Sequence, residues 1–131
     1  MKHISVLIVD NHKGTRTALA KILSLDKRLK IVGEAANGKE AIAKVKELFP
    51  EVVLMDIKMP KMDGLQATRC IKESHPEIRI IMLSAYGEKG LVNEAIKLGA
   101  SAYLIKNCQI EDIIQIIVDE HEAPETKQSA G

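Results

Sequence analysis

The chain has 131 residues, the size of one compact domain, and its composition of 46% hydrophobic and 28% charged residues is that of an ordinary globular protein. Its formal net charge of +1 gives no electrostatic field that would recruit nucleic acid or anionic membranes. Its three aromatic residues (two tyrosines and one phenylalanine) are too few for a base-stacking platform. The two cysteines predict no disulfide framework, and no segment reads as a signal peptide or membrane span, so we expect a soluble, cytoplasmic protein.

Short apolar segments alternate with longer segments of helical period along the whole chain. The apolar segments are rich in β-branched residues and nearly continuous, which predicts strands buried on both faces. In chain order the expected elements are strand Ile4–Val9, helix Thr15–Leu25, strand Lys30–Ala35, helix Gly38–Leu48, strand Val52–Met55, helix Leu65–Glu73, strand Ile78–Leu83, a helix ended by Gly99, strand Ala102–Ile105 and a last helix from Ile110.

Strict alternation of strands and helices predicts an α/β fold with a parallel sheet covered on both faces. The expected arrangement is a doubly wound five-stranded sheet of flavodoxin-like order 2-1-3-4-5. We expect residues 1–120 to form one domain. Residues 121–131 are polar, lack apolar periodicity and contain Pro124, which predicts a tail or the start of a linker.

Four polar side chains follow or end strands of this predicted sheet: Asp10, Asp56, Ser84 and Lys106. Asp10 and Asp56 follow strands 1 and 3, between which a sheet of this order has its switch point, and ligands bind there. Two carboxylates held close repel each other, and a hard divalent cation such as Mg²⁺ relieves that repulsion. A lysine and a hydroxyl opposite the metal are suited to a phosphoryl group, and a carboxylate can itself form an acyl phosphate.

The motifs around these positions resemble the receiver domain of two-component response regulators. The resemblance covers about Ser5 to Glu120 and rests on four motifs in order: Val6–Asp10, Val53–Pro60 with Met62–Gly64, Leu83–Ala85, and Gly99–Lys106. It implies a signalling domain that promotes only its own phosphorylation and dephosphorylation, and not an enzyme in the ordinary sense.

The resemblance implies that Asp56 accepts a phosphoryl group from a histidine kinase or a phosphotransfer protein. Asp10, Asp56 and the backbone carbonyl of Lys58 would hold Mg²⁺. At the position where the family usually has a second acid, this chain has Asn11. An amide oxygen still coordinates, but one negative charge is missing, so we expect weaker Mg²⁺ binding.

The resemblance also implies a switch. Ser84 and Lys106 would bind the phosphoryl group, and Tyr103 would be the coupled aromatic side chain. Lys58 and Tyr86 would tune how quickly water reaches the acyl phosphate. Many receivers have a proline after the lysine in a cis peptide, whereas this chain has Asn107, and a non-proline cis bond costs about 2.5–4 kcal/mol.

The resemblance implies that output passes through the fourth helix, the fifth strand and the fifth helix. The broad apolar arc of the last helix, which includes Ile116 and Val118, fits either a core-facing surface or a surface for a homodimer or an output partner. The sequence details look like those of receivers joined to DNA-binding modules in a longer chain, although this segment itself would not contact DNA or a membrane.

Two alternatives remain from the residues. A degenerate receiver would act by protein contacts without phosphorylation, and Asn11 is the feature that favours it. A flavodoxin-like enzyme or a phosphohydrolase is disfavoured, because Asn11–Gly14 is not a Gly-rich phosphate loop and no Asp-x-Asp signature follows strand 1. Nearby, His12 is interpreted as a first-turn loop residue and Asp63 as a structural residue at the start of the third helix.

Overall fold

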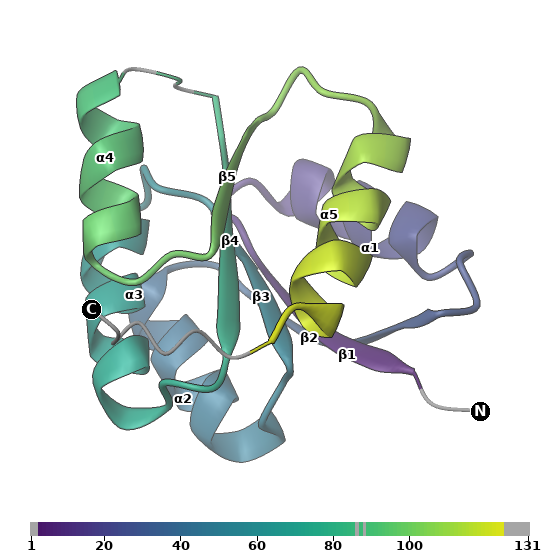
Figure 1. Ribbon diagram of the computed structural model, residues 1–131, viewed down its shortest axis with the longest axis horizontal. Coiled ribbons are helices and arrows are strands. Elements are labelled where there is room, and N and C mark those ends of the chain that lie inside the picture. The colour runs from purple at the N-terminus through teal and green to yellow at the C-terminus, as the bar shows by residue number, and fades with distance from the viewer. Residues whose placement is uncertain (1–2, 86, 88, 125–131) are drawn as a thin grey trace.

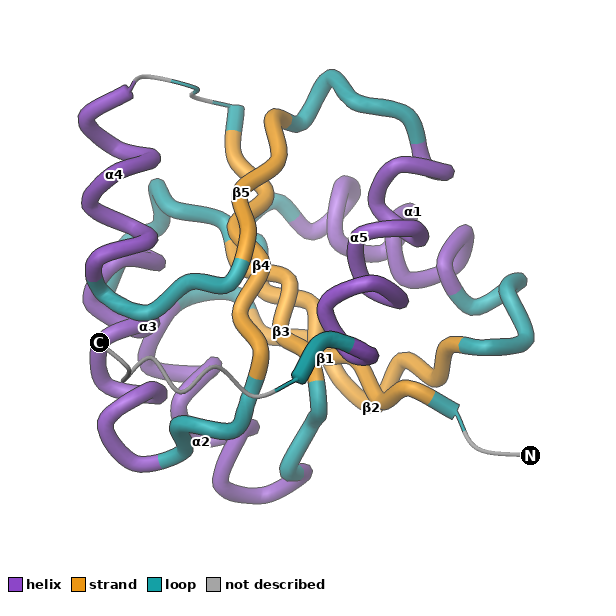
Figure 2. The backbone as a smooth tube through the Cα atoms, in the orientation of Figure 1, coloured by secondary structure: helices purple, strands orange, loops and turns teal. Residues whose placement is uncertain are grey.

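A central parallel sheet carries helices on both of its faces, in a computed structural model that describes residues 3–85, 87 and 89–124 (Figure 1). The strand order β2-β1-β3-β4-β5 is the predicted one. The strands are β1 Ile4–Val9, β2 Leu29–Ala35, β3 Val52–Met55, β4 Arg79–Ser84 and β5 Ala102–Ile105. The helices are α1 Lys13–Leu23, α2 Gly38–Leu48, α3 Gly64–Ser74, α4 Lys89–Lys97 and α5 Ile110–Glu122. Helices α2, α3 and α4 cover one face, and α1 and α5 cover the other (Figure 2).

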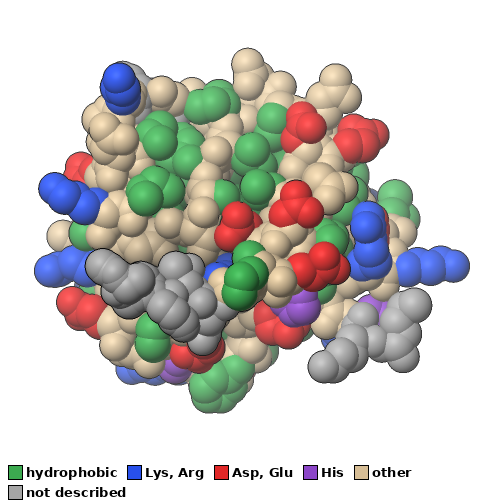
Figure 3. Space-filling model, in the orientation of Figure 1, with side chains coloured by type: hydrophobic (Ala, Val, Ile, Leu, Met, Phe, Trp, Pro, Cys, Tyr) green, Lys and Arg blue, Asp and Glu red, His purple; other side chains and the backbone are tan. Residues whose placement is uncertain are grey.

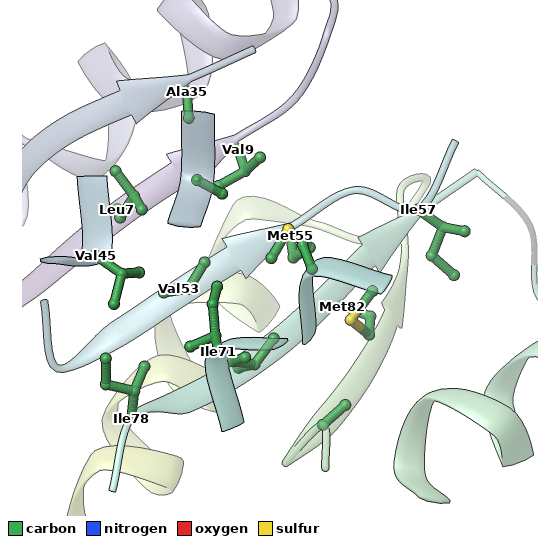
Figure 4. Packing of buried hydrophobic residues seen from close by; sticks show 14 of the residues in the cluster. Leu7, Val9, Ala35, Val45, Val53, Met55, Ile57, Ile71, Ile78 and Met82 are labelled. Atoms are coloured by element: carbon green, nitrogen blue, oxygen red, sulfur yellow. The ribbon is translucent and has the colours of Figure 1, made fainter. Parts of the chain in front are cut away.

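The sheet separates two apolar clusters, which explains why the strands are apolar on both faces. Along β1, Leu7 and Val9 belong to the cluster under α2, α3 and α4, whereas Val6 and Ile8 belong to the cluster under α1 and α5. Figure 4 shows the first cluster, in which side chains of β1, β3 and β4 meet those of α2 and α3. Each fully buried aliphatic side chain of this size stabilises the fold by about 1.5–3 kcal/mol.

Helix α1 starts and ends two residues earlier than the periodicity predicts. His12 is its extended N-cap, and the carbonyl oxygen of His12 accepts the first helical hydrogen bond, from the Arg16 amide, at 2.9 Å. The hydroxyl of Ser24 donates to the Ala20 carbonyl at 2.7 Å at the other end. Leu25 lies beyond the helix with 82% of its surface exposed. Ile22, which follows Leu19 at helical spacing, has 46% of its surface exposed.

Side-chain caps fix where α2 and α3 begin, and therefore where the loops at this end of the sheet stop. The side chain of Asn37 accepts from the Glu40 amide at 3.0 Å, and that of Asp63 accepts from the Gln66 amide at 2.9 Å. Such caps stabilise a helix by about 0.5–2 kcal/mol. The structural interpretation of Asp63 is thus confirmed.

The last helix, α5, turns its broad apolar arc towards the core. Ile117 and Val118 are buried, and Ile116 packs against the same cluster. The helix continues to Glu122, so it includes the first two residues of the segment that the sequence assigns to the tail. Among the helices of the described ranges, none is both long enough and apolar enough to cross a bilayer.

Candidate functional site

The structure brings the four predicted strand-end residues to one edge of the sheet: Asp10, Asp56, Ser84 and Lys106. Backbone hydrogen bonds continue just past the strands, since the amide of Asp56 donates to the Val9 carbonyl at 3.0 Å and that of Lys106 donates to the Ser84 carbonyl at 2.8 Å. The exposed fraction is 3% for Asp10, 6% for Asp56 and 0% for Ser84. Polar groups this deeply buried need partners, and Lys106 and nearby backbone amides supply those of Asp10 and Asp56.

Lys106 joins the two carboxylates. Its Nζ donates to Asp10 Oδ2 at 2.7 Å and to Asp56 Oδ2 at 3.2 Å. Burial alone would lower the pKa of the Lys106 ammonium, but the hydrogen bond to Asp10 and the charge of Asp56 outweigh burial and raise it. Burial raises the pKa of Asp56 above its ordinary value; Lys106 opposes this change and the charge of Asp10 adds to it. Additional positive charge at this edge would therefore stabilise the ionised site.

Asp10 is positioned by two residues that the sequence interpretation did not assign to the site. Its Oδ1 accepts from the His12 amide at 2.8 Å and lies 3.5 Å from the imidazole Nδ1 of His12. Arg16 donates through Nη1 to the backbone carbonyl of Asp10 at 2.7 Å and through Nε to Glu34 at 3.0 Å. Arg16 lies one helical turn after His12 in the sequence. This spacing is the sequence signal that could have indicated its contact with Asp10.

The donor groups at this edge fit a divalent cation. Ligand atoms of Asp10, His12 and Asp56 all lie within 4.8 Å of one another. Metal–ligand bonds of about 2.0–2.2 Å place opposite ligands about 4.0–4.4 Å apart, so small side-chain adjustments would close such a shell. The side-chain oxygen of Asn11 is buried and has no hydrogen-bond partner in the described part of the chain. Mg²⁺ prefers oxygen ligands of these kinds, so the residues present fit the ion that the sequence predicts.

Gly64 allows the start of α3 to pack directly against the backbone of Asp56. The Gly64 amide donates to the Ile57 carbonyl at 2.8 Å, and a Cβ on Gly64 would overlap the carbonyl oxygen of Asp56. The Ile57 amide in turn donates to Asp56 Oδ1 at 2.8 Å. In the sequence Gly64 is only the last residue of the motif Met62–Gly64, whereas in the structure its backbone packs against that of Asp56.

The remaining predicted residues of the described part lie on β5 and in the loop after β3. Tyr103 is partly buried, is paired with Met82 across the sheet and packs against the cluster under α2, α3 and α4. The side chain of Lys58 is exposed, and the role of its carbonyl oxygen stays a prediction. Tyr86 lies outside the described residues. The described part has no cis peptide bond, so the bond between Lys106 and Asn107 is trans.

Comparison with known proteins gives one consistent result. The family model "Response regulator receiver domain" matches residues 6–118. The chain is 37% identical over 118 residues to the transcriptional regulatory protein LnrK of Bacillus subtilis and 40% identical over 114 residues to the response regulator protein VraR of Staphylococcus aureus. These matches cover 90% and 87% of the chain but 54% of each relative, so the chain spans about half the length of the curated relatives that it matches.

A solved structure is similar over most of its length. The crystal structure of the CheX–CheY–BeF₃–Mg²⁺ complex from Borrelia burgdorferi includes a chain with a TM-score of 0.85 and 32% sequence identity. The match covers 92% of this chain and 90% of that one.

Proposed function

Because the chain belongs to the response regulator receiver domain family, we propose that it accepts a phosphoryl group on Asp56 from a histidine kinase or a phosphotransfer protein. The observation that carries this proposal is the position of Asp56. Its carboxylate is almost completely buried at the switch point of the sheet and is bridged to Asp10 by Lys106. Receiver domains are not enzymes in the ordinary sense, and the reaction proposed here ends on the domain itself.

The proposed reaction needs little beyond positioning and charge neutralisation. An oxygen of the Asp56 carboxylate attacks the phosphorus atom of a phosphohistidine, the N–P bond breaks, and an acyl phosphate forms. Lys106 lies 3.2 Å from Asp56 and would neutralise the phosphoryl oxygens as they approach. A bound Mg²⁺ would supply further positive charge, held by Asp10, Asp56, Asn11 and the Lys58 carbonyl. The similar Borrelia burgdorferi structure, a complex with BeF₃ and Mg²⁺, supports this assignment.

We propose that the phosphoryl group is detected by Ser84 and Tyr103. Ser84 is completely buried at the end of β4, and Tyr103 lies on the neighbouring β5. A shift of Ser84 towards a phosphoryl group would therefore be transmitted to the β5 side chains. Lys58 and Tyr86, two positions after Asp56 and Ser84, would tune the access of water to the acyl phosphate.

The output surface that we propose is formed by α4, β5 and α5. Figure 3 shows hydrophobic side chains gathered over α4 and β5 on this face, and Ile96 of α4 has 47% of its surface exposed. An effector domain or a second copy of the chain would dock there. Since LnrK is named as a transcriptional regulatory protein and the chain covers only half of it, we propose that this receiver controls a DNA-binding output domain.

The experiment that tests Asp56 is incubation with acetyl phosphate, with and without Mg²⁺, followed by intact-mass measurement. The expected result is a mass gain of one phosphoryl group that depends on Mg²⁺ and disappears in Asp56→Ala. Asp63→Asn is the matched control, because it changes a carboxylate of the same loop while retaining a good N-cap for α3. This control should take up phosphate at the wild-type rate.

The missing acid at position 11, where the chain has Asn11, favours a second candidate, the degenerate receiver that acts through protein contacts alone. Absence of any adduct on the wild-type chain, with Mg²⁺ present and the chain folded, would establish that alternative. An adduct that persists in Asp56→Ala would instead place the acceptor at another residue.

A further inference from the structure

His12 has an imidazole ring beside the carboxylates that no structural contact fully explains. The helix-capping position of His12 is served by its backbone, and its side chain makes no capping hydrogen bond. The ring faces Asp10 at 3.5 Å, but 71% of its side chain is exposed. An ion pair of that length and exposure contributes at most about 1 kcal/mol, so it gives little reason for the ring to stay there.

We propose that the imidazole of His12 is a metal ligand and that this site binds borderline first-row transition-metal ions more tightly than Mg²⁺. The ligand atoms of Asp10, His12 and Asp56 lie within 4.8 Å of one another, so one ion can reach all three. Because the His12 side chain is largely exposed, its ring can reorient towards an ion at little cost. The site would then have two carboxylates and one nitrogen donor.

The charge of the site supports this selectivity. Asp10, Asp56 and Lys106 together carry one negative charge, so a divalent ion leaves the site with a net charge of +1. Mg²⁺ depends mainly on the charge of oxygen ligands, and Asn11 supplies an amide where an acid would add charge. A neutral imidazole adds no charge, and it suits the later ions of the series from Fe²⁺ to Zn²⁺, which includes Co²⁺, better than Mg²⁺.

The buried oxygen of Asn11 is an independent observation that points to a ligand. It has no hydrogen-bond partner within the described residues, and a buried polar atom of this kind costs about 1–3 kcal/mol when it stays unsatisfied. Asn11 lies between Asp10 and His12 in the chain. An ion held by its two neighbours is the partner that this oxygen would gain.

The test is calorimetric titration of the whole chain with Co²⁺ and, separately, with Mg²⁺. We expect the wild-type chain to bind Co²⁺ at least tenfold more tightly than Mg²⁺. His12→Ala should weaken Co²⁺ binding about tenfold while changing the Mg²⁺ dissociation constant less than twofold. His3→Ala is the matched control. It removes an exposed histidine that precedes β1 and contacts the Lys27 carbonyl, and it should leave the Co²⁺ and Mg²⁺ dissociation constants unchanged.

Asp56→Asn serves to locate the ion and should weaken the binding of both metals. An unchanged Co²⁺ affinity in His12→Ala, or a wild-type preference for Mg²⁺, would overturn the proposal. The proposed metal site includes Asp56, the acceptor of the proposed function, but metal binding does not require that phosphoryl transfer takes place. Metal binding that behaves as expected on a chain that takes up no phosphate would contradict the proposed function alone.

Discussion

The ammonium group of Lys106 donates a 2.7 Å hydrogen bond to Asp10, a partner 96 positions earlier in the chain. The two residues follow β5 and β1, which are not neighbours, since β3 and β4 lie between them in the sheet. A single side chain therefore connects the first and last strands across the candidate site. The same ammonium neutralises two carboxylates that would otherwise repel each other.

Replacing Lys106 by Met should destabilise the fold by about 2 kcal/mol at neutral pH, because two buried carboxylates lose their shared cation. The loss should shrink as the pH falls, since protonated carboxylates need no cation. Added Mg²⁺ should restore more stability to this variant than to the wild type. Urea unfolding at several pH values, with and without MgCl₂, measures all three effects.

Lys97→Met, on the exposed side of α4, is the control for the loss of a lysine. Its free energy of unfolding should change by less than about 0.5 kcal/mol, as is usual for surface substitutions. Equal effects of the two substitutions would mean that the Lys106 bridge contributes nothing to the fold.

Adding one methyl group at Gly64 should disturb the candidate acceptor. Because a Cβ there would overlap the Asp56 carbonyl oxygen, Gly64→Ala should cost about 2 kcal/mol or more of stability and slow phosphate uptake. Gly14→Ala is the control: a Cβ at Gly14 meets nothing within 4 Å, and an alanine inside α1 should stabilise the fold by about 0.5–1 kcal/mol. Thermal unfolding with a phosphorylation time course compares the two variants, and destabilisation by both would point to a general helix effect.

Restoring the second acid should tighten Mg²⁺ binding. Asn11→Asp adds a carboxylate next to Asp10, so the Mg²⁺ dissociation constant should fall about tenfold, equivalent to about 1.4 kcal/mol. Without metal, the added negative charge should make the variant less stable than the wild type. Titration calorimetry gives the affinity, and an unchanged Mg²⁺ affinity would contradict the role assigned to Asn11.

Glu51 provides a pH test at the opposite edge of the sheet. Burial would raise its pKa, but the hydrogen bond from the Ser5 amide at 2.9 Å and the contact with His121 at 3.0 Å outweigh burial and lower it. A carboxylate with a lowered folded-state pKa adds stability above its unfolded pKa and loses it as the pH falls through the folded value.

Glu51→Gln should therefore cost about 1 kcal/mol at neutral pH, a modest figure because the side chain is half exposed. The difference from the wild type should vanish in acid. Glu47→Gln, an exposed change on α2, should show no such dependence. Denaturant unfolding from pH 7 down to pH 3 follows both variants, and a difference that persists in acid would refute the assignment.

The sequence predicted the sheet order and the placement of four polar residues at one edge of the sheet, because buried parallel strands have a strong apolar signal and end where polar residues begin. It misplaced α1 by two residues, since the capping of a helix by the backbone of His12 has no strong sequence pattern. It also missed Arg16, whose contact with Asp10 depends on side-chain conformation. The approach of Gly64 to Asp56 likewise requires the three-dimensional path of the loop.

The separation of the two edges of the sheet has a consequence for engineering. All four strand-end site residues lie at the carboxyl edge, whereas the connections from each helix to the next strand lie at the opposite edge. Leu25, in the first of these connections, is 82% exposed. Lengthening a surface connection costs little, about 0.6 kcal/mol per doubling of its length. A short epitope or a fluorescent reporter inserted beside Leu25 should therefore leave the chemistry of the distant edge intact.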